Sequence, residues 1–198
     1  MRKSLFLLTI IVGLLSSCTT ILKTTYGIKK PRVENKGTLI KYLTKTGIDT
    51  NNTLIPKDLK LFKKVAGEFG ESIPEAVMFD SEGNRVTYKK TDQDCNAGLF
   101  STIPSLTKNS KLRDEKGTNL TEFIQELVTM NNQDEVKSLP KSDYYLFISW
   151  AKYVGKLNQD HLKDWIGLAK ANKNVKITVY KVNLDFQQVW GLELGKKM

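Results

Sequence analysis

The stretch from residue 144 to residue 184 constrains the fold of this chain more than any other part of it. Residues 144–150, Y-Y-L-F-I-S-W, form an apolar run that predicts a buried strand covered on both faces. Apolar residues at helical spacing follow, and V-K-I-T-V-Y-K-V-N-L predicts a second strand. Two strands joined by a helix form a parallel pair with a right-handed crossover. The sequence therefore predicts an α/β fold.

Two helices are predicted nearer the beginning of the chain. Asn35 is a suitable N-cap for a helix that ends near Gly47, because a side-chain oxygen at the cap accepts from the free backbone N–H groups of the first turn. Pro56 and the helical apolar spacing after it predict a second helix that ends at Gly70. We expect both helices to cover a sheet.

A hairpin and a third helix are predicted in the middle of the chain. In residues 73–90, two apolar segments flank the turn S-E-G-N, in which Gly83 supplies the positive φ that the turn needs. Residues 91–117 are polar and irregular, which predicts a long loop with at most one helical turn. Asn119 and the apolar spacing over residues 120–130 predict an amphipathic helix.

The size and charge of the chain suit one domain of ordinary size. Of its 198 residues 40% are apolar, which is enough for a proper core, and the formal charge is +10. The lysines occur as scattered pairs without interleaved aromatic residues, so we expect no nucleic-acid partner. A solvated surface is the first interpretation of this charge, and attraction to anionic phospholipid head groups is the second.

The most specific motif lies at the start of the sequence. Arg2 and Lys3 precede an apolar run that is too short to span a bilayer comfortably, and L-S-S-C then ends at Cys18. This resembles the signal peptide and lipobox of bacterial lipoproteins, in which the cysteine is acylated and becomes the first mature residue. The resemblance implies lipidation of Cys18 and a membrane partner reached through that lipid. The alternative is an ordinary secretory signal with a chance cysteine.

The lipoprotein resemblance also implies a location and a plan for the chain. Threonines rather than Asp follow the cysteine, which in similar lipoproteins implies the outer membrane of the bacterial cell envelope; the inner membrane is the alternative. We expect residues 1–17 to be the signal peptide and residues 18–34 to be a lipidated N-terminus with a flexible tether. Residues 35–198 are then a single domain.

The strand–helix–strand unit resembles the first half of a thioredoxin fold. In that family a buried strand ends in Trp-Ala, the loop W-C-G-P-C begins a helix, and the next strand ends just before an Asp. Trp150 and Gly155 match this pattern, as does V-N-L-D at residues 182–185. The resemblance implies a degenerate active-site loop that comprises Trp150, Tyr153, Val154, Gly155, Lys156 and Leu157.

The degenerate loop lacks the residues that redox chemistry needs. Val154 and Leu157 stand at the two cysteine positions, and Lys156 stands at the proline position. Thiol–disulfide exchange requires a thiolate and a second sulfur that resolves the mixed disulfide. A dithiol oxidoreductase at this loop is therefore excluded, and a generic βαβ unit of another α/β fold is the alternative to the resemblance.

A second partial resemblance to thioredoxin precedes the first one in the chain. Ile73-Pro74 and the hairpin after it look like the later thioredoxin hairpin, in which a cis-proline opens a strand. In the family this half follows the βαβ half. We therefore expect a permuted thioredoxin-like three-layer sandwich, with a mixed sheet of about four strands, helices on both faces, and the hairpin packed beside residues 144–150. A chance Ile-Pro pair is the alternative.

Few other residues indicate chemistry. With Cys18 occupied by lipid, Cys95 is the only remaining thiol, so no intramolecular disulfide can form in the mature domain. Without a resolving thiol Cys95 is a weak catalytic candidate, and the alternatives are an intermolecular disulfide or partner contact and a packed, inert thiol. His161 is the only histidine, which excludes metal sites and triads built on several histidines. No nucleotide-binding loop motif occurs. We expect no metal and no cofactor.

Two functions follow from the sequence. The first is a membrane-anchored lipoprotein whose non-redox thioredoxin-like domain binds an unknown protein or serves as a structural or accessory module, and is not an enzyme. The alternative is a single-cysteine, thiol-dependent oxidoreductase that uses Cys95.

Overall fold

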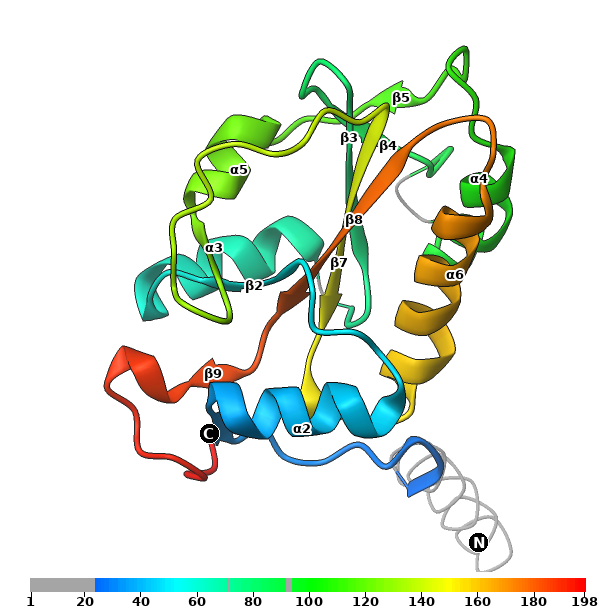
Figure 1. Cartoon of the computed structure of the whole chain (residues 1–198). Coiled ribbons are helices and arrows are strands. Elements are labelled where there is room, and N and C mark those ends of the chain that lie inside the picture. Colours follow the sequence, from blue (N-terminus) through cyan, green and yellow to red (C-terminus); the bar gives the residue numbers. More distant parts are fainter. Residues whose placement is uncertain (1–23, 71, 92–93) are drawn as a thin grey trace, which may run out of the picture.

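The computed structural model describes residues 24–70, 72–91 and 94–198 (Figure 1). The lipobox and Cys18 lie outside the described residues. The α/β prediction is confirmed, but the main mixed sheet has seven strands where about four were expected. No helix in the described ranges is long and apolar enough to cross a membrane. The strand order in the sheet is β5 (Arg113–Asp114), β4 (Arg85–Thr87), β3 (Ala76–Asp80), β7 (Tyr144–Trp150), β8 (Ile177–Asn183), β2 (Thr53–Pro56) and β6 (Leu127–Thr129).

Helices cover both faces of this sheet. Buried side chains of three helices pack on one face and buried side chains of two others pack on the opposite face. The first group is α2 (Lys36–Thr46), α4 (Leu99–Ser105) and α6 (Asp164–Ala171); the second is α3 (Leu59–Phe69) and α5 (Leu120–Gln125). Figure 1 shows α3 and α5 on one side of β7 and β8, and α4 and α6 on the other. A π-helical turn, Asn158–Lys163, leads directly into α6.

Strand β7 lies at the centre of the core because its side chains alternate between the two faces. Leu146 and Ile148 belong to the buried cluster beneath α2, α4 and α6, whereas Tyr145 and Phe147 belong to the cluster beneath α3 and α5. All seven residues of β7 are buried. An apolar run without alternation is therefore what a strand between two helical layers requires.

The pairing of β7 joins the two parts of the chain that the sequence singled out. It runs parallel to β8 through all seven residues and antiparallel to β3. Ala76 lies opposite Ile148, and Asp80 lies opposite Tyr144. The hairpin of β3 and β4 thus packs beside residues 144–150, as expected.

The predicted ends of α2 are confirmed, but the predicted start of α3 is wrong. The side chain of Asn35 accepts from the backbone N–H of Thr38 at 3.0 Å, and Gly47 ends α2 with φ of 70°. The prediction that Pro56 opens the next helix is wrong, because Pro56 ends β2 and pairs with Leu127. Asp58 caps α3 instead.

Two predictions in the middle of the chain are corrected by long-range packing. The helix expected over residues 120–130 ends at Gln125, and β6 then pairs antiparallel with β2. The expected loop at 91–117 contains α4, whose Leu99 and Ile103 are fully buried, and the short β5. These elements are stabilised by contacts with segments far away in the sequence: β6 with β2, β5 with β4, and α4 with α6. No local sequence pattern therefore indicated them.

The segment expected to be a tether packs on the domain from residue 24 onward. Val33 is buried, and β1 (Val33–Glu34) pairs parallel with β9 (Phe186–Gln187). A second contact joins the backbone N–H of Met198 to the carbonyl of Pro31 at 3.1 Å. The domain therefore begins before residue 35, and a backbone pairing this short leaves no periodic signal in the sequence.

Candidate functional site

The features that the sequence singled out meet at one end of the sheet. Strand β7 ends at Trp150, opposite Asn183 of the parallel strand β8, and carboxyl ends of parallel strands are where α/β sheets collect functional residues. On its other side β7 is flanked by the start of β3. The peptide bond between Ile73 and Pro74, just before β3, is cis. The degenerate loop and Pro74 are therefore neighbours.

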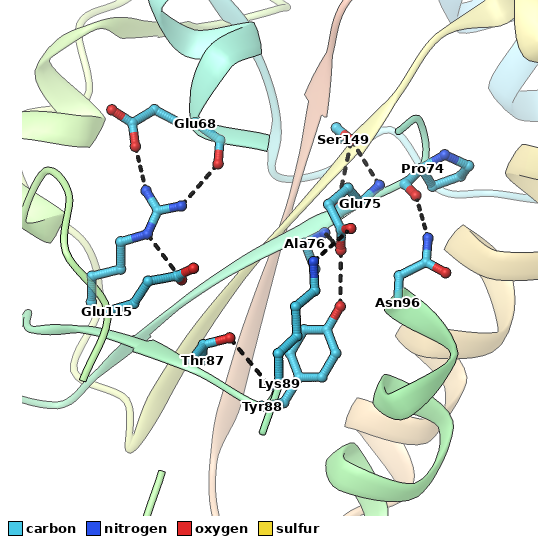
Figure 2. Close-up of polar contacts among 11 residues, drawn as sticks. Glu68, Pro74, Glu75, Ala76, Thr87, Tyr88, Lys89, Asn96, Glu115 and Ser149 are labelled. Carbon is cyan, nitrogen blue, oxygen red and sulfur yellow. Dashed lines mark hydrogen bonds and ion pairs between the residues drawn. The ribbon is translucent and has the colours of Figure 1, made fainter. Parts of the chain in front are cut away.

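Glu75, directly after Pro74, is held by a network that we call the Glu75 group (Figure 2). Its backbone exchanges hydrogen bonds with Ser149 of β7: the Glu75 N–H donates to Oγ at 2.9 Å, and the Ser149 N–H donates to the Glu75 carbonyl at 2.8 Å. Tyr88 donates its hydroxyl to Oε1 at 2.9 Å, and Lys89 pairs with Oε2 at 3.2 Å. Burial, followed by the charge of Glu75, raises the pKa of Tyr88. A buried carboxylate is thus neutralised where β3 begins.

Cys95 lies next to this group. The side-chain amide of Asn96 donates to the carbonyl of Pro74 at 2.7 Å, as Figure 2 shows, and so fixes the adjacent Cys95 near the cis peptide bond. Cys95 is exposed and free. An exposed thiol beside the cis-proline can meet a partner, but the described part of the chain supplies no second thiol to resolve a mixed disulfide.

A second buried carboxylate, Asp185, lies just past the end of β8. Its Oδ2 accepts from the backbone N–H of Lys152 at 2.7 Å and from the amide of Asn183 at 2.8 Å. Burial raises the pKa of Asp185 to about 6, although these hydrogen bonds oppose the shift. The ammonium group of Lys152 pairs with Glu34 of β1 at 2.7 Å. This network fixes the first residues of the degenerate loop.

The segment that enters from the N-terminal side covers the degenerate loop. The backbone N–H of Lys156 donates to the carbonyl of Tyr26 at 2.8 Å, and the N–H of Lys29 donates to the carbonyl of Tyr153 at 2.8 Å. Gly155 has φ of +63°, and a Cβ built on it would lie 2.2 Å from the Tyr26 oxygen. Only glycine allows this close backbone approach. The surface at this loop therefore includes residues 26–29.

Helix α2 closes the loop from the other side. Tyr42 stacks on the fully buried Trp150, with ring centroids 5.9 Å apart and an interplanar angle of 8°. The amide of Asn158 donates to the Tyr42 hydroxyl at 2.8 Å and to the Ala151 carbonyl at 2.7 Å. The Tyr42 hydroxyl in turn donates to the Gly155 carbonyl at 3.0 Å. No sequence pattern indicated the contact of Tyr42 with Asn158, because the two residues are more than a hundred positions apart.

The arrangement offers little for catalysis at the loop itself. Val154 is buried and Leu157 is half-buried, and neither apolar side chain offers a nucleophile or a group that transfers a proton. His161 packs edge-on against the rings of Trp165 and Phe100, at centroid distances of 5.3 and 5.9 Å. In the described ranges no three His, Cys, Asp or Glu side chains are placed to hold a metal.

A polar cavity of about 250 Å³ lies between α3 and the hairpin, and its charged groups are already paired. Arg85 bonds to Glu68 and Glu115, and Lys89 bonds to Glu75 (Figure 2). A ligand that entered this cavity would have to break these ion pairs. The cavity is better explained as part of the packing between α3 and β4.

Comparisons with known proteins identify no relative of this chain: no family model, curated protein or solved structure matches it. Any functional assignment therefore depends on its own residues. Those residues place a thiol-free loop, a cis-proline, a carboxylate paired with Lys89 and a buried, hydrogen-bonded Asp185 at one end of a mixed sheet.

Proposed function

We propose that this chain is a bacterial lipoprotein, held in the cell envelope by a lipid on Cys18, whose domain is a non-redox thioredoxin-like module that binds a protein partner. One observation carries the proposal about the domain. The hairpin behind the cis peptide bond and the βαβ unit share one sheet, so Pro74 flanks a loop in which Val154 and Leu157 replace cysteines. The outer membrane is the location that we propose.

The arrangement of the sheet supports a permuted thioredoxin-like three-layer sandwich. Strands β4, β3, β7 and β8 lie side by side, with helices on both faces. The hairpin precedes the βαβ unit in the chain, as a permutation requires. Strands β2, β5 and β6 then extend this sheet at its two edges.

A binding role follows from what the loop lacks and what surrounds it. Its backbone is held by Tyr26, Lys29 and Asp185, and no thiol is available for exchange. Beside it, Phe100 of α4 is exposed and makes edge-on contacts to His161 and Trp165. An aromatic ring supported by other rings is a suitable anchor for a protein contact.

Lipidation is tested by metabolic labelling of the full-length protein with a palmitate analogue. We expect label on the wild type and on Cys95→Ala, and none on Cys18→Ala, because acylation requires the lipobox cysteine. Separation of the two membranes then gives the location. Equal labelling of Cys18→Ala and wild type would refute the anchor.

Binding without redox activity is tested in two assays on the same protein. We expect the wild type to leave the rate of disulfide reduction by dithiothreitol unchanged, whereas a redox-active thioredoxin accelerates it. A photoreactive residue at Phe100 should yield a discrete cross-linked product in cells, and one at Lys108, exposed at the opposite end of β7, should not. Acceleration of the reduction would contradict the non-redox assignment, and equal cross-linking at both positions would contradict the binding surface.

The second candidate function is a thiol-dependent oxidoreductase that uses Cys95. The observation in its favour is the exposed thiol held beside Pro74 through Asn96. The rate of Cys95 alkylation against pH tests it. If the alkylation rate levels off at a pH well below the ordinary thiol pKa of about 8.5, Cys95 is an activated thiolate. A rate that keeps rising up to about that pKa rules out the oxidoreductase.

A further inference from the structure

We propose that the surface formed by residues 29–32 and 189–198 docks on an anionic lipid bilayer. The proposal uses the proposed lipid anchor only to decide which side of the domain faces the membrane. The two segments are joined through their backbones: the N–H of Val33 donates to Lys196 and the N–H of Gly195 donates to Val33, both at 2.9 Å. Figure 1 shows both segments at the end of the molecule where α2 lies.

Positively charged side chains are concentrated on this surface, and they are not paired with Asp or Glu side chains of the described residues. Arg32 and Lys197 form an antiparallel bridge, and like charges placed directly opposite each other on paired strands repel. Glu193 is the only acid in residues 189–198. Within the described residues, none of the five exposed cations of this surface forms an ion pair. These cations, which we call the terminal basic surface, are Lys29, Lys30, Arg32, Lys196 and Lys197.

The same surface exposes apolar side chains. Val189 is 49% exposed, Leu194 is 43% exposed and Met198 is 49% exposed, and together they account for three of the five large apolar side chains that stand out from the described structure. A combination of cations and exposed apolar groups is typical of proteins that lie on a bilayer, because the cations meet anionic head groups and the apolar groups enter the interfacial layer. A nucleic acid would offer nothing for these apolar groups.

The position of the anchor directs this surface toward the membrane. Five residues separate Cys18 from Thr24, where the described chain begins, and the six residue-to-residue steps between them can span at most about 22 Å when fully extended. Residues 24–29 then run along the degenerate loop toward the terminal basic surface. A lipid on Cys18 therefore holds this end of the domain close to the head groups.

Docking is tested with the full-length lipidated protein in vesicles that contain nitroxide-labelled lipid. A fluorophore is attached at Leu194→Cys in a Cys95→Ser background, and a matched control carries it at Glu82→Cys in the exposed turn at the far end of β3. We expect severalfold stronger quenching at position 194 than at position 82 in phosphatidylglycerol-containing vesicles. The difference should shrink in phosphatidylcholine vesicles and at high salt, because screening weakens attraction to head groups.

Charge reversal completes the test. We expect K196E/K197E to lower the quenching at position 194, and K108E/K111E, an exposed pair near the opposite end of β7, to leave it unchanged. Equal quenching at positions 194 and 82, or quenching that ignores lipid charge, would overturn the proposal. If the chain carries no lipid, the lipoprotein assignment fails instead, and the same labelled protein added to preformed vesicles still decides the docking.

Discussion

The backbone N–H of Lys152 donates a 2.7 Å hydrogen bond to Oδ2 of Asp185, and this contact ties the end of β7 to the end of β8. Asp185 is 1% exposed, and burial raises its pKa to about 6. A second hydrogen bond from Asn183 holds the same oxygen. The start of the degenerate loop thus depends on one buried carboxyl group whose protonation changes in a mildly acidic range.

We expect the stability of the protein to depend on pH through Asp185. The folded chain binds the carboxyl proton of Asp185 more tightly than the unfolded chain, in which the pKa of an aspartate is about 3.8. The contribution of Asp185 to the free energy of unfolding is therefore fully present below about pH 4, and it is lost as the pH rises to about 6. It amounts to about 2–3 kcal/mol. Denaturant unfolding at several pH values should show that Asp185→Asn flattens the slope over this range, while the exposed Asp160→Asn keeps it. Identical slopes in all three proteins would contradict the assignment.

Gly155 should be required for the segment that covers the loop. An added Cβ would meet the Tyr26 carbonyl at 2.2 Å and would also force a side chain onto a positive φ. We expect Gly155→Ala to cost about 2–4 kcal/mol of unfolding free energy and to speed tryptic cleavage after Lys29 severalfold.

Gly27→Ala is the matched control for Gly155→Ala. Gly27 has φ of +65° but open space around its Cβ position, so its substitution adds only the backbone strain, about 1–2 kcal/mol. Tryptic cleavage rates that rise equally in the two variants would show that the contact with Tyr26 does not hold the segment.

The Glu75 group should stabilise the end of the sheet that carries Pro74. Glu75→Ala removes the acceptor of the Tyr88 hydroxyl and the partner of Lys89, which are both partly buried. We expect a loss of about 2–3 kcal/mol in denaturant unfolding. Glu82→Ala, in the exposed turn of the same hairpin, should change stability by less than about 0.5 kcal/mol. A Glu75→Ala variant as stable as Glu82→Ala would mean that the network contributes little.

Features of the fold that depend on near neighbours could be predicted from the sequence. The cap at Asn35 and the turn at Gly83 involve residues within a few positions, and β7 is apolar because both of its faces are covered. β6 could not be predicted, because Leu127 and Val128 suit the buried stripe of a helix as well as a strand. What decides between the two is the partner strand β2, which lies about seventy residues earlier.

In the candidate site, too, features set by neighbouring residues could be predicted, and features set by residues distant in sequence could not. Pro74 and the loop around Gly155 were found from short motifs, and Asp185 is the last residue of V-N-L-D. Glu75 follows Pro74 directly, but its role is set by Tyr88 and Lys89 on the next strand. Such a network is made by the pairing of β3 and β4, and residue types alone do not indicate it.

Restoring cysteines at the degenerate loop tests the proposed thioredoxin-like geometry most directly. Val154 and Leu157 are three residues apart where the chain enters the helical segment before α6, which is the spacing of the cysteines in the loop that it resembles. We expect V154C/L157C, in a Cys95→Ser background, to form an intramolecular disulfide under mild oxidation. Mass spectrometry and the loss of both alkylatable thiols would measure it.

The V154C/L157C prediction depends on geometry rather than on the mere presence of two thiols. A disulfide requires Cβ atoms roughly 3.5–4.5 Å apart with suitable directions, which the turn around Gly155 has to provide. The control pair is Tyr153→Cys with Leu157→Cys. It lies in the same loop with its two positions one residue further apart, and it should oxidise far more slowly. Free thiols in V154C/L157C, or equal oxidation of the control pair, would show that the loop lacks thioredoxin-like geometry and that only the βαβ topology is shared.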